Sequence, residues 1–174
     1  YCFLKENPSQ DMIQSLVNPQ KEVTPFVTKL TGITQQMVNS ASIFEDHAQS
    51  ILEFTSNSGN YSYLVAHNGD NYDFIMLREH LRVLGYNLNN LPIRSLDTLL
   101  LAKKIYPHLN KYSLGHLCSQ LNCGFLNAHR AEGDTRMVQN LFRYMLNDLV
   151  NILGVSRDDL LQNPNLIYDY INGN

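Results

Sequence analysis

The sequence predicts an α/β domain, because segments patterned like β-strands alternate along the chain with segments of helical periodicity. The 174 residues are 44% hydrophobic and 17% charged, which is enough apolar material for one core. No internal repeat, low-complexity tract or linker-like stretch divides the sequence. We therefore expect one domain over residues 1–155, followed by a polar C-terminal extension over residues 156–174.

Four segments have the pattern of strands. Residues 1–4 and 12–17 are the first two, and a turn at Asn18 and Pro19 then leads into an irregular stretch through Gly32. The run YSYLVAHNG, which ends at Gly69, is typical of a largely buried strand. The run IRSLDT predicts a shorter strand.

Apolar residues at helical spacing predict the helices. A capping-box pattern, Ser42-x-x-Glu45, marks the start of the first. A cap at Ser113 precedes another amphipathic segment. The remaining helices are expected over residues 72–84, 99–106 and 132–149, with a short one near 157–161 and a loose terminus beyond it.

Composition excludes several classes of protein. A formal net charge of −3 argues against a uniformly basic surface, but it is compatible with a local basic groove or with an acidic site that a metal neutralises. The three cysteines form no C-x-x-C pair and lack histidines at zinc-finger spacing, which fits a reducing, intracellular compartment. No run of membrane length and no leader pattern is present, and a first residue of Tyr1 suggests a chain that starts inside a longer product.

Two aspartates are predicted to face inward from different helices. Asp73 lies four residues before Leu77, which begins the apolar stripe of its helix. Asp134 lies three and four residues before Met137 and Val138 in the last long helix. A carboxylate turned toward an apolar interior costs several kcal/mol unless something compensates it. Each of the two acids therefore needs a partner.

Three kinds of partner are open. Partial positive charge at a helix N-terminus is the simplest, and for either aspartate alone it is the better explanation. A buried cation is the second, with Arg94 as the one obvious candidate on the predicted strands. A divalent metal is the third, since oxygen ligands suit Mg²⁺ or Mn²⁺. Two inward acids that each follow a loop favour the metal when they are considered together.

His129 and its neighbours add a base and positive charge. His129 precedes Asp134 by five residues, and an imidazole with a pKa near ~6.5 is a natural general base, although a lone histidine is more often a surface-loop residue. Arg130, Lys111 and Tyr112 could line a groove for phosphates. Ordinary solvated side chains are an equally good interpretation of each one individually.

Several motifs together resemble a known family. The segments LVAHNGDNYDF (64–74), SLDTL (95–99), YSLGHLC (112–118) and HRAEGD (129–134) are similar to the DEDDh group of 3'-to-5' exonucleases, above all its TREX (three-prime repair exonuclease) branch. SLVNP and LTGIT resemble the same family's strand end and substrate-side loop. The likeness spans residues 10–147. A histidine five residues before an aspartate, combined with HNG...YDF, is specific, whereas LTGIT or SLDTL alone is weak.

The resemblance implies a fold, a reaction and roles for residues. It implies a ribonuclease-H-like mixed sheet flanked by helices, and removal of nucleoside 5'-monophosphates from a 3' end with two Mg²⁺ or Mn²⁺ ions about 3.5 to 4 Å apart. Asp73 corresponds to the second catalytic acid and Asp134 to the last, both as metal ligands, and His129 corresponds to the general base. Further residues are implied near the terminal base, namely Leu30, Thr31, Gly32 and Ile33, with Asn68 shaping the adjoining loop.

One departure from the family pattern is large. The family's first motif, Asp-x-Glu on the opening strand, occurs nowhere in this sequence, and the residues 132–134 have its spacing in reverse order. The implied fold therefore lacks its opening strand, which is central in the family's sheet. Truncation explains this better than evolved loss, because the later motifs are intact. With half of the carboxylates, we expect weak or no metal binding by the chain as it stands.

The leading hypothesis is a Mg²⁺-dependent 3'-to-5' exonuclease domain that acts on nucleic acid with a free 3' end, with single-stranded DNA favoured by the TREX likeness. The alternative is a pseudo-nuclease that serves as a nucleic-acid-binding or scaffolding module. A small-molecule-binding α/β protein is disfavoured because no glycine-rich phosphate loop is present. A homodimer follows from the resemblance only, and the location is expected to be cytoplasmic or nuclear with no membrane contact.

Overall fold

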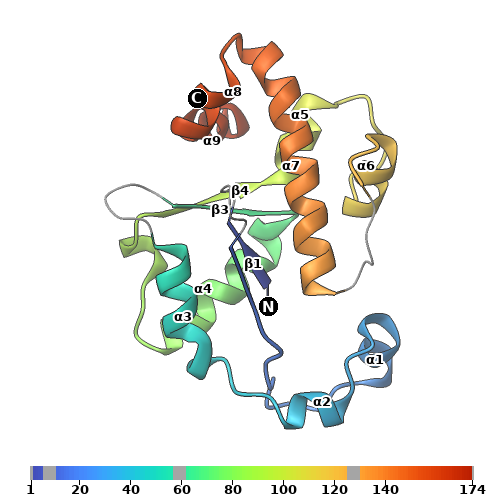
Figure 1. Ribbon diagram of the computed structural model, residues 1–174, viewed down its shortest axis with the longest axis vertical. Helices are drawn as coiled ribbons and strands as arrows, with labels where there is room; N and C mark the ends of the chain where they lie inside the picture. The colour runs from blue at the N-terminus through green and yellow to red at the C-terminus, as the bar shows by residue number, and fades with distance from the viewer. Residues whose placement is uncertain (1, 6–10, 57–61, 125–129, 174) are drawn as a thin grey trace.

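The computed structural model describes residues 2–5, 11–56, 62–124 and 130–173 (Figure 1). Strands and helices alternate along this part of the chain, so the α/β prediction is confirmed. Its helices are α1 (Pro25–Thr31), α2 (Gln35–Asn39), α3 (Glu45–Thr55), α4 (Asp73–Val83), α5 (Thr98–Ile105), α6 (Leu114–Gln120), α7 (Ala131–Leu153), α8 (Arg157–Gln162) and α9 (Asn165–Asn172). Two short 3₁₀ helices are η1 (Gly69–Asn71) and η2 (Leu88–Asn90).

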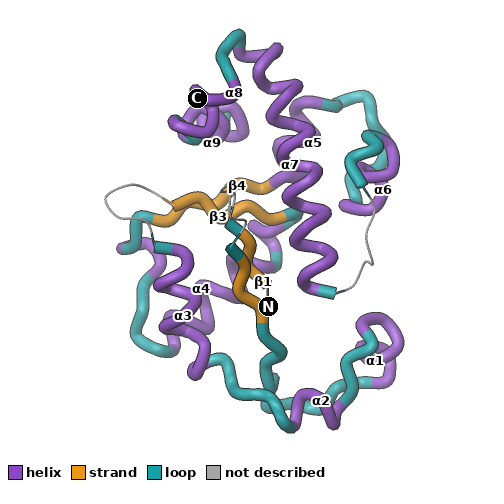
Figure 2. The backbone as a smooth tube through the Cα atoms, in the orientation of Figure 1, coloured by secondary structure: helices purple, strands orange, loops and turns teal. Residues whose placement is uncertain are grey.

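The strands form two separate pairs. β1 (Cys2–Leu4) is antiparallel to β2 (Met12–Gln14), whereas β3 (Ser62–Ala66) is parallel to β4 (Ile93–Asp97). Figure 2 shows the two pairs in orange, running in different directions. Within the described residues no ladder joins one pair to the other. All four predicted strands exist, although β2 and β3 each end three residues earlier than expected.

The prediction of irregular structure through Gly32 is wrong, because α1 forms there. The Thr24 hydroxyl accepts a hydrogen bond from the Val27 N–H and caps the helix, and Pro25 occupies its first turn. Gly32 ends the helix with φ of 71°, a left-handed conformation that glycine adopts without strain. A start signal and a stop signal with seven residues between them thus mark a helix with too few turns to show an apolar stripe.

The predicted capping box at Ser42 and Glu45 does not form. α3 begins at Glu45 with Phe44 as its N-cap and without a side-chain cap bond. The carbonyl of Ser42 instead accepts a hydrogen bond from the Asn18 N–H at 2.8 Å, so Ser42 belongs to the preceding connection. A real capping box lies at α8, where Ser156 and Asp159 bond to each other's backbone N–H groups.

The core is built around α7, the long helix drawn in orange in Figure 1. Leu141, Met145 and Leu149 are fully buried on one of its faces and belong to a single cluster with residues of β4, α5 and α6. Burial of this stripe, about 25 cal/mol for each Å² of apolar surface, stabilises the packing of α5 and α6 against α7. None of the described helices is long and apolar enough to cross a membrane.

The C-terminal helices join the same core, so the expectation of a loose terminus is wrong. Leu160 of α8 and Ile167 of α9 are 0% and 1% exposed. The Tyr63 hydroxyl donates to the Asn165 side chain at 2.7 Å, and the Lys104 ammonium donates to the carbonyl of Tyr170 at 2.6 Å. Residues 156–173 therefore combine a polar surface with an apolar anchor, which their composition alone did not reveal.

This anchoring predicts a large effect of Ile167→Ala. The substitution should lower the free energy of unfolding by about 2–5 kcal/mol, because it leaves a cavity in a buried cluster. Urea denaturation followed by circular dichroism measures the loss. Leu161→Ala in the neighbouring helix is the control, since Leu161 is 43% exposed and its truncation should cost about 0.5 kcal/mol or less. Equal costs for the two variants would show that α9 is not part of the core.

Candidate functional site

Asp73 stands at the first position of α4, directly after a tightly packed loop. The loop leaves β3 through Asn68, which takes a left-handed conformation (φ 61°, ψ 29°) and accepts a side-chain hydrogen bond from Asn71 at 2.8 Å. Asparagine tolerates this conformation better than most residues. A side chain at Gly69 would place its Cβ 2.6 Å from the ring of Phe74, so only glycine fits there. The sequence HNG thus fixes the path of the chain into Asp73.

A buried carboxylate at the end of β4 holds this loop. Asp97 is 3% exposed, and its Oδ1 accepts hydrogen bonds from the N–H groups of Asn68 and Leu99, both at 2.8 Å. Its Oδ2 accepts the N–H of Asp70 at 3.3 Å. The Leu99 bond caps α5, and the other two tie β4 to the loop that leads to Asp73. Asp97 therefore positions Asp73 without lying on the same strand or helix.

His67 connects the same loop to a third segment. Its Nε2 lies 2.7 Å from the carbonyl of Tyr112 and must carry a proton there, because a carbonyl only accepts. Its Nδ1 lies 3.0 Å from the hydroxyl of Thr98. Burial lowers the pKa of His67, an effect that the Tyr112 carbonyl and the charges of Asp97 and Asp73 partly offset. A mostly neutral imidazole thus joins the ends of β3 and β4 to the segment before α6.

Asp134 brings the second predicted acid to the same place from α7. It lies in the first turn of that helix, and both Asp134 and Asp73 line one groove of about 1680 Å³. The pKa of Asp73 is raised, first by burial and then by the negative charges of Asp97 and Asp134, while the bond to its own backbone N–H and the nearby His67 act in the opposite direction. The two acids therefore act on each other electrostatically.

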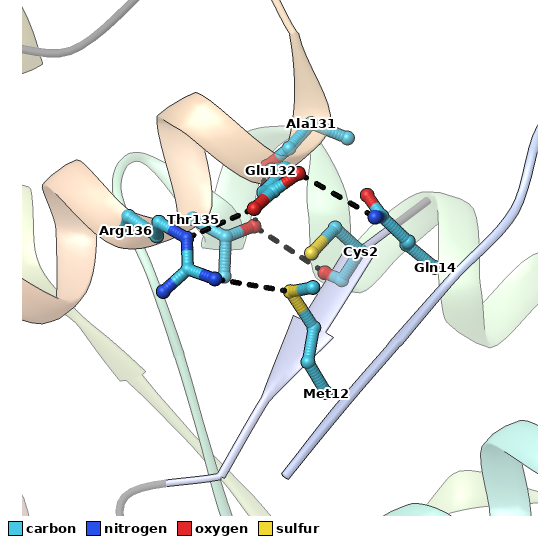
Figure 3. A network of polar contacts seen from close by, with 7 residues as sticks. All are labelled: Cys2, Met12, Gln14, Ala131, Glu132, Thr135 and Arg136. Carbon is cyan, nitrogen blue, oxygen red and sulfur yellow. Dashed lines mark hydrogen bonds and ion pairs between the residues drawn. The ribbon is translucent and has the colours of Figure 1, made fainter. Parts of the chain in front are cut away.

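The first turns of α7 are fastened to the β1–β2 hairpin. Figure 3 shows Glu132 between Arg136, whose Nε lies 3.0 Å from it, and Gln14, which donates to it at 3.4 Å. The Arg136 guanidinium also reaches the sulfur of Met12 at 3.9 Å. Glu132, although only two residues before Asp134, thus faces the hairpin and not the other carboxylates. Sequence reasoning did not find this network, because its partners lie more than a hundred residues apart.

The remaining predicted residues lie in several places. A Cβ on Gly32 would come 3.2 Å from the Arg130 guanidinium, so the end of α1 with Leu30 and Thr31, and Gly32 and Ile33 after it, meets the start of α7. Lys111 is exposed, and the Tyr112 hydroxyl donates to the carbonyl of Tyr106 at 2.7 Å. The general base predicted at His129 lies outside the described residues.

The cation considered as a partner for the acids lies elsewhere. Arg94 donates to the side chain of Asn165, and its guanidinium lies 5.2 Å from the centre of the Tyr168 ring. It therefore serves the contact between β4 and α9. Sequence alone could not tell whether Arg94 pairs with the acids or contacts α9, because the answer depends on where the C-terminal helix packs.

Asp73 and Asp134 offer the type of ligand atom, carboxylate oxygen, that a divalent cation such as Mg²⁺ binds. Mg²⁺ is bound by oxygen, often through one or two carboxylates together with substrate phosphates and water. Besides burial, the charges of Asp97 and Asp134 raise the pKa of Asp73, and a cation would relieve this negative potential. Among the residues that the structure describes, however, no three His, Cys, Asp or Glu side chains gather as a metal-binding group. Asp73 and Asp134 thus remain a pair of candidate ligands.

Comparisons with known proteins agree with the fold and the motifs. The sequence model of the Exonuclease family (RNase_T) matches residues 5–142. DNA polymerase III PolC-type of Caldanaerobacter subterraneus is 34% identical over 149 residues, which are 86% of this chain and 10% of that protein. The 3'-5' exonuclease DinG of Bacillus subtilis is 29% identical over 133 residues, 76% of this chain and 14% of that protein. The chain thus spans about a tenth of the length of the curated relatives that it matches.

A solved structure supports the ribonuclease-H-like fold. Exonuclease X, determined in complex with 5' overhanging duplex DNA, superposes with a TM-score of 0.58 at 23% identity, over 85% of this chain and 78% of that one. The fold prediction is confirmed. The relatives do not single out the TREX branch, which stays a prediction.

The Asp97 contacts predict a local effect of Asp97→Asn. Asparagine keeps one acceptor oxygen but turns an NH₂ group toward one of the three buried N–H groups, which should cost about 1–3 kcal/mol of stability. The Asp70 amide should exchange its hydrogen faster than the loss of global stability alone would cause. NMR-detected exchange measures it, with Asp46→Asn, an exposed acid in the first turn of α3, as the control. Unchanged exchange at Asp70 would contradict the role given to Asp97.

Proposed function

Because the chain belongs to the DEDDh exonuclease family, we propose that it is the nuclease domain of a 3'-to-5' exonuclease that removes nucleoside 5'-monophosphates from the 3' ends of DNA or RNA. One observation carries this proposal. Two carboxylates, Asp73 and Asp134, reach a single groove from separate helices, and the charge of Asp134 adds to burial in raising the pKa of Asp73. Such an arrangement is unfavourable for a purely structural site and useful for binding a cation and a phosphodiester.

Asp73 and Asp134 would hold Mg²⁺ or Mn²⁺ in this proposal. Two such ions, when bound, supply activation of the attacking water and stabilisation of the leaving oxygen. The chain's own contribution is to keep the two carboxylates in place, through the Asp97 contacts on one side and the Glu132 network on the other. The family's Asp-x-Glu ligands are not in this sequence, so a complete site needs carboxylates from outside residues 1–174.

The remaining roles concern the substrate. His129 would accept the proton of the attacking water as the general base. The loop over Leu30, Thr31, Gly32 and Ile33 would meet the terminal base, and Asn68 would shape the turn beside it. Arg130 touches that loop at Gly32 and, with Lys111 and Tyr112, would contact phosphates. Single-stranded DNA is the proposed substrate. The TREX likeness also suggests a homodimer, and the cysteines suggest an intracellular location.

A binding module without chemistry is the second candidate. The number of carboxylates favours it, because only two of the four metal-binding carboxylates of the family are present in the sequence. Such a module would bind nucleic acid in the same groove without cleaving it. The two candidates differ in their products and not in their affinity for DNA.

Shortening of a 5'-labelled single-stranded oligonucleotide tests the proposed activity. The chain as given should be inactive or nearly so, and the chain extended at its N-terminus by a strand bearing Asp-x-Glu should shorten the oligonucleotide from its 3' end with Mg²⁺. In the extended chain, His129→Ala, Asp73→Asn and Asp134→Asn should each slow the reaction by ~100-fold or more. Denaturing gels measure the products over time.

Asp158→Asn is the matched control, because Asp158 is an exposed acid of α8 outside the groove. It should leave the rate unchanged. An extended chain that binds the oligonucleotide without shortening it would support the binding module instead. An extended chain that neither binds nor cleaves would overturn both candidates.

A further inference from the structure

A second pocket lies beside α7, away from the groove. Its lining residues come from α7, from the turn after α6 and from the start of α8, and none of them lines the groove. Arg143, which lines this pocket, follows Asp134 by nine residues of the same helix. Nine residues are about two and a half turns, so the two side chains leave α7 on opposite sides. The pocket is therefore separate from the site of the two acids.

Positive charge without negative charge distinguishes this pocket, which we call the arginine pocket. Arg143 of α7 and Arg157 of α8 both line it, and among the described residues no Asp or Glu does. Two acids close to them in sequence are directed elsewhere, since Asp148 accepts the Tyr106 hydroxyl at 2.5 Å and Asp159 belongs to the capping box of α8. In a chain with a net charge of −3, this pocket is thus a local reversal of charge.

Side-chain amides surround the two arginines. Nη1 of Arg157 donates to Oδ1 of Asn147 at 3.0 Å, which ties the start of α8 to α7. A Cβ on Gly124 would come 3.2 Å from Nδ2 of Asn140, so the turn after α6 packs against that amide. Asn122 of the same turn also lines the pocket. Because each amide carries two N–H donors, all three segments that form the pocket bring donors to it.

A phosphate group with two negative charges matches these donors. A guanidinium presents its N–H groups in a fixed fork that fits phosphate oxygens. A phosphate monoester carries about two negative charges at neutral pH and three strong acceptor oxygens, whereas a diester carries a single charge. The volume of about 380 Å³ is in the range of small-ligand pockets, and the 38% exposed Tyr144 ring adds an apolar surface. Charge balance thus favours a monoester over the phosphodiester of a nucleic acid.

We propose that the arginine pocket binds the dianionic phosphate group of inorganic phosphate or of a small phosphate monoester. Arg143 and Arg157 pair with the phosphate oxygens, and the amides of Asn140 and Asn147 donate further hydrogen bonds. Any organic part of the ligand lies against Tyr144. This inference does not depend on the proposed nuclease activity, because the arginine pocket and the groove share no lining residue.

NMR titration of the 174-residue chain tests the pocket. The probes are inorganic phosphate, thymidine 5'-monophosphate and dimethyl phosphate, a diester with one charge. Inorganic phosphate and the nucleotide should shift the Nε–H signals of Arg143 and Arg157 to saturation, with a Kd of about 1 mM or lower. Dimethyl phosphate should bind at least about tenfold more weakly, because it lacks the second charge. Tighter binding of the nucleotide than of phosphate would support a monoester as the ligand, and equal binding would support phosphate itself.

Three variants locate the binding. Arg143→Gln and Arg157→Gln should each weaken phosphate binding at least about tenfold, because each removes a charge-assisted pair. Arg82→Gln is the matched control, since it removes the same charge from an exposed position of α4 that lines neither the arginine pocket nor the groove. It should leave the Kd unchanged, and circular dichroism checks that all three variants are folded.

Several results would overturn the proposal. Dimethyl phosphate that binds as tightly as phosphate would show a site that does not select two charges. An equal loss of affinity in all three folded variants would show attraction by net charge and no defined pocket. Arginine signals that do not shift, or that shift without saturation, would show that no phosphate binds there.

Discussion

The site depends on holding two negative charges beside one groove. Asp73 and Asp134 come from helices that are distant in sequence, and the charge of Asp134 is one cause of the raised pKa of Asp73. A carboxyl whose pKa is raised by folding favours the folded state at low pH. Its contribution is lost as the pH rises from the unfolded pKa, near ~3.9, through the folded value. At neutral pH the ionised Asp73 therefore opposes folding, and a bound cation would reverse that effect.

Two separate sets of contacts resist this repulsion. On the β4 side, Asp97 accepts three backbone N–H groups and fixes the loop before Asp73. On the α7 side, Glu132 and Arg136 fasten the helix start to the hairpin. The charge of Asp97 also raises the pKa of Asp73, so the first set affects the site electrostatically as well. Such support fits a site whose first function is to hold ligand atoms in place, since the supporting groups must be rigid for the carboxylates to stay together.

Sequence reasoning found the elements that have long apolar patterns. α4 and α7 were predicted from their stripes, and the same spacing put Asp73 and Asp134 on the side of the groove, although Asp73 is exposed there and not buried. It missed α1, because seven residues are too few for a stripe to show, although Thr24, Pro25 and Gly32 carried the start and stop signals. It also missed α9, whose fully buried residue Ile167 and partly buried neighbours pack against the core.

The supporting contacts of the site could not be predicted in the same way. SLDTL was recognised as a motif, but the role of Asp97 depends on its three backbone donors, two of them in a loop almost thirty residues earlier. The separation of the strands into two pairs depends on which edges meet in space, which no local pattern records. Local periodicity thus gave the positions of the acids, and tertiary contacts gave the reason that they stay together.

The pKa of Asp73 in the Asp134→Asn variant tests the convergence of the two acids most directly. Carbon-detected NMR titration of the Asp73 carboxyl should give a pKa above that of an ordinary aspartate in the unaltered chain, and a lower pKa once the charge of Asp134 is removed. Asp158→Asn should leave the value as it was. A pKa of Asp73 that is the same in all three proteins would contradict the account, because the two carboxylates would then not share a site.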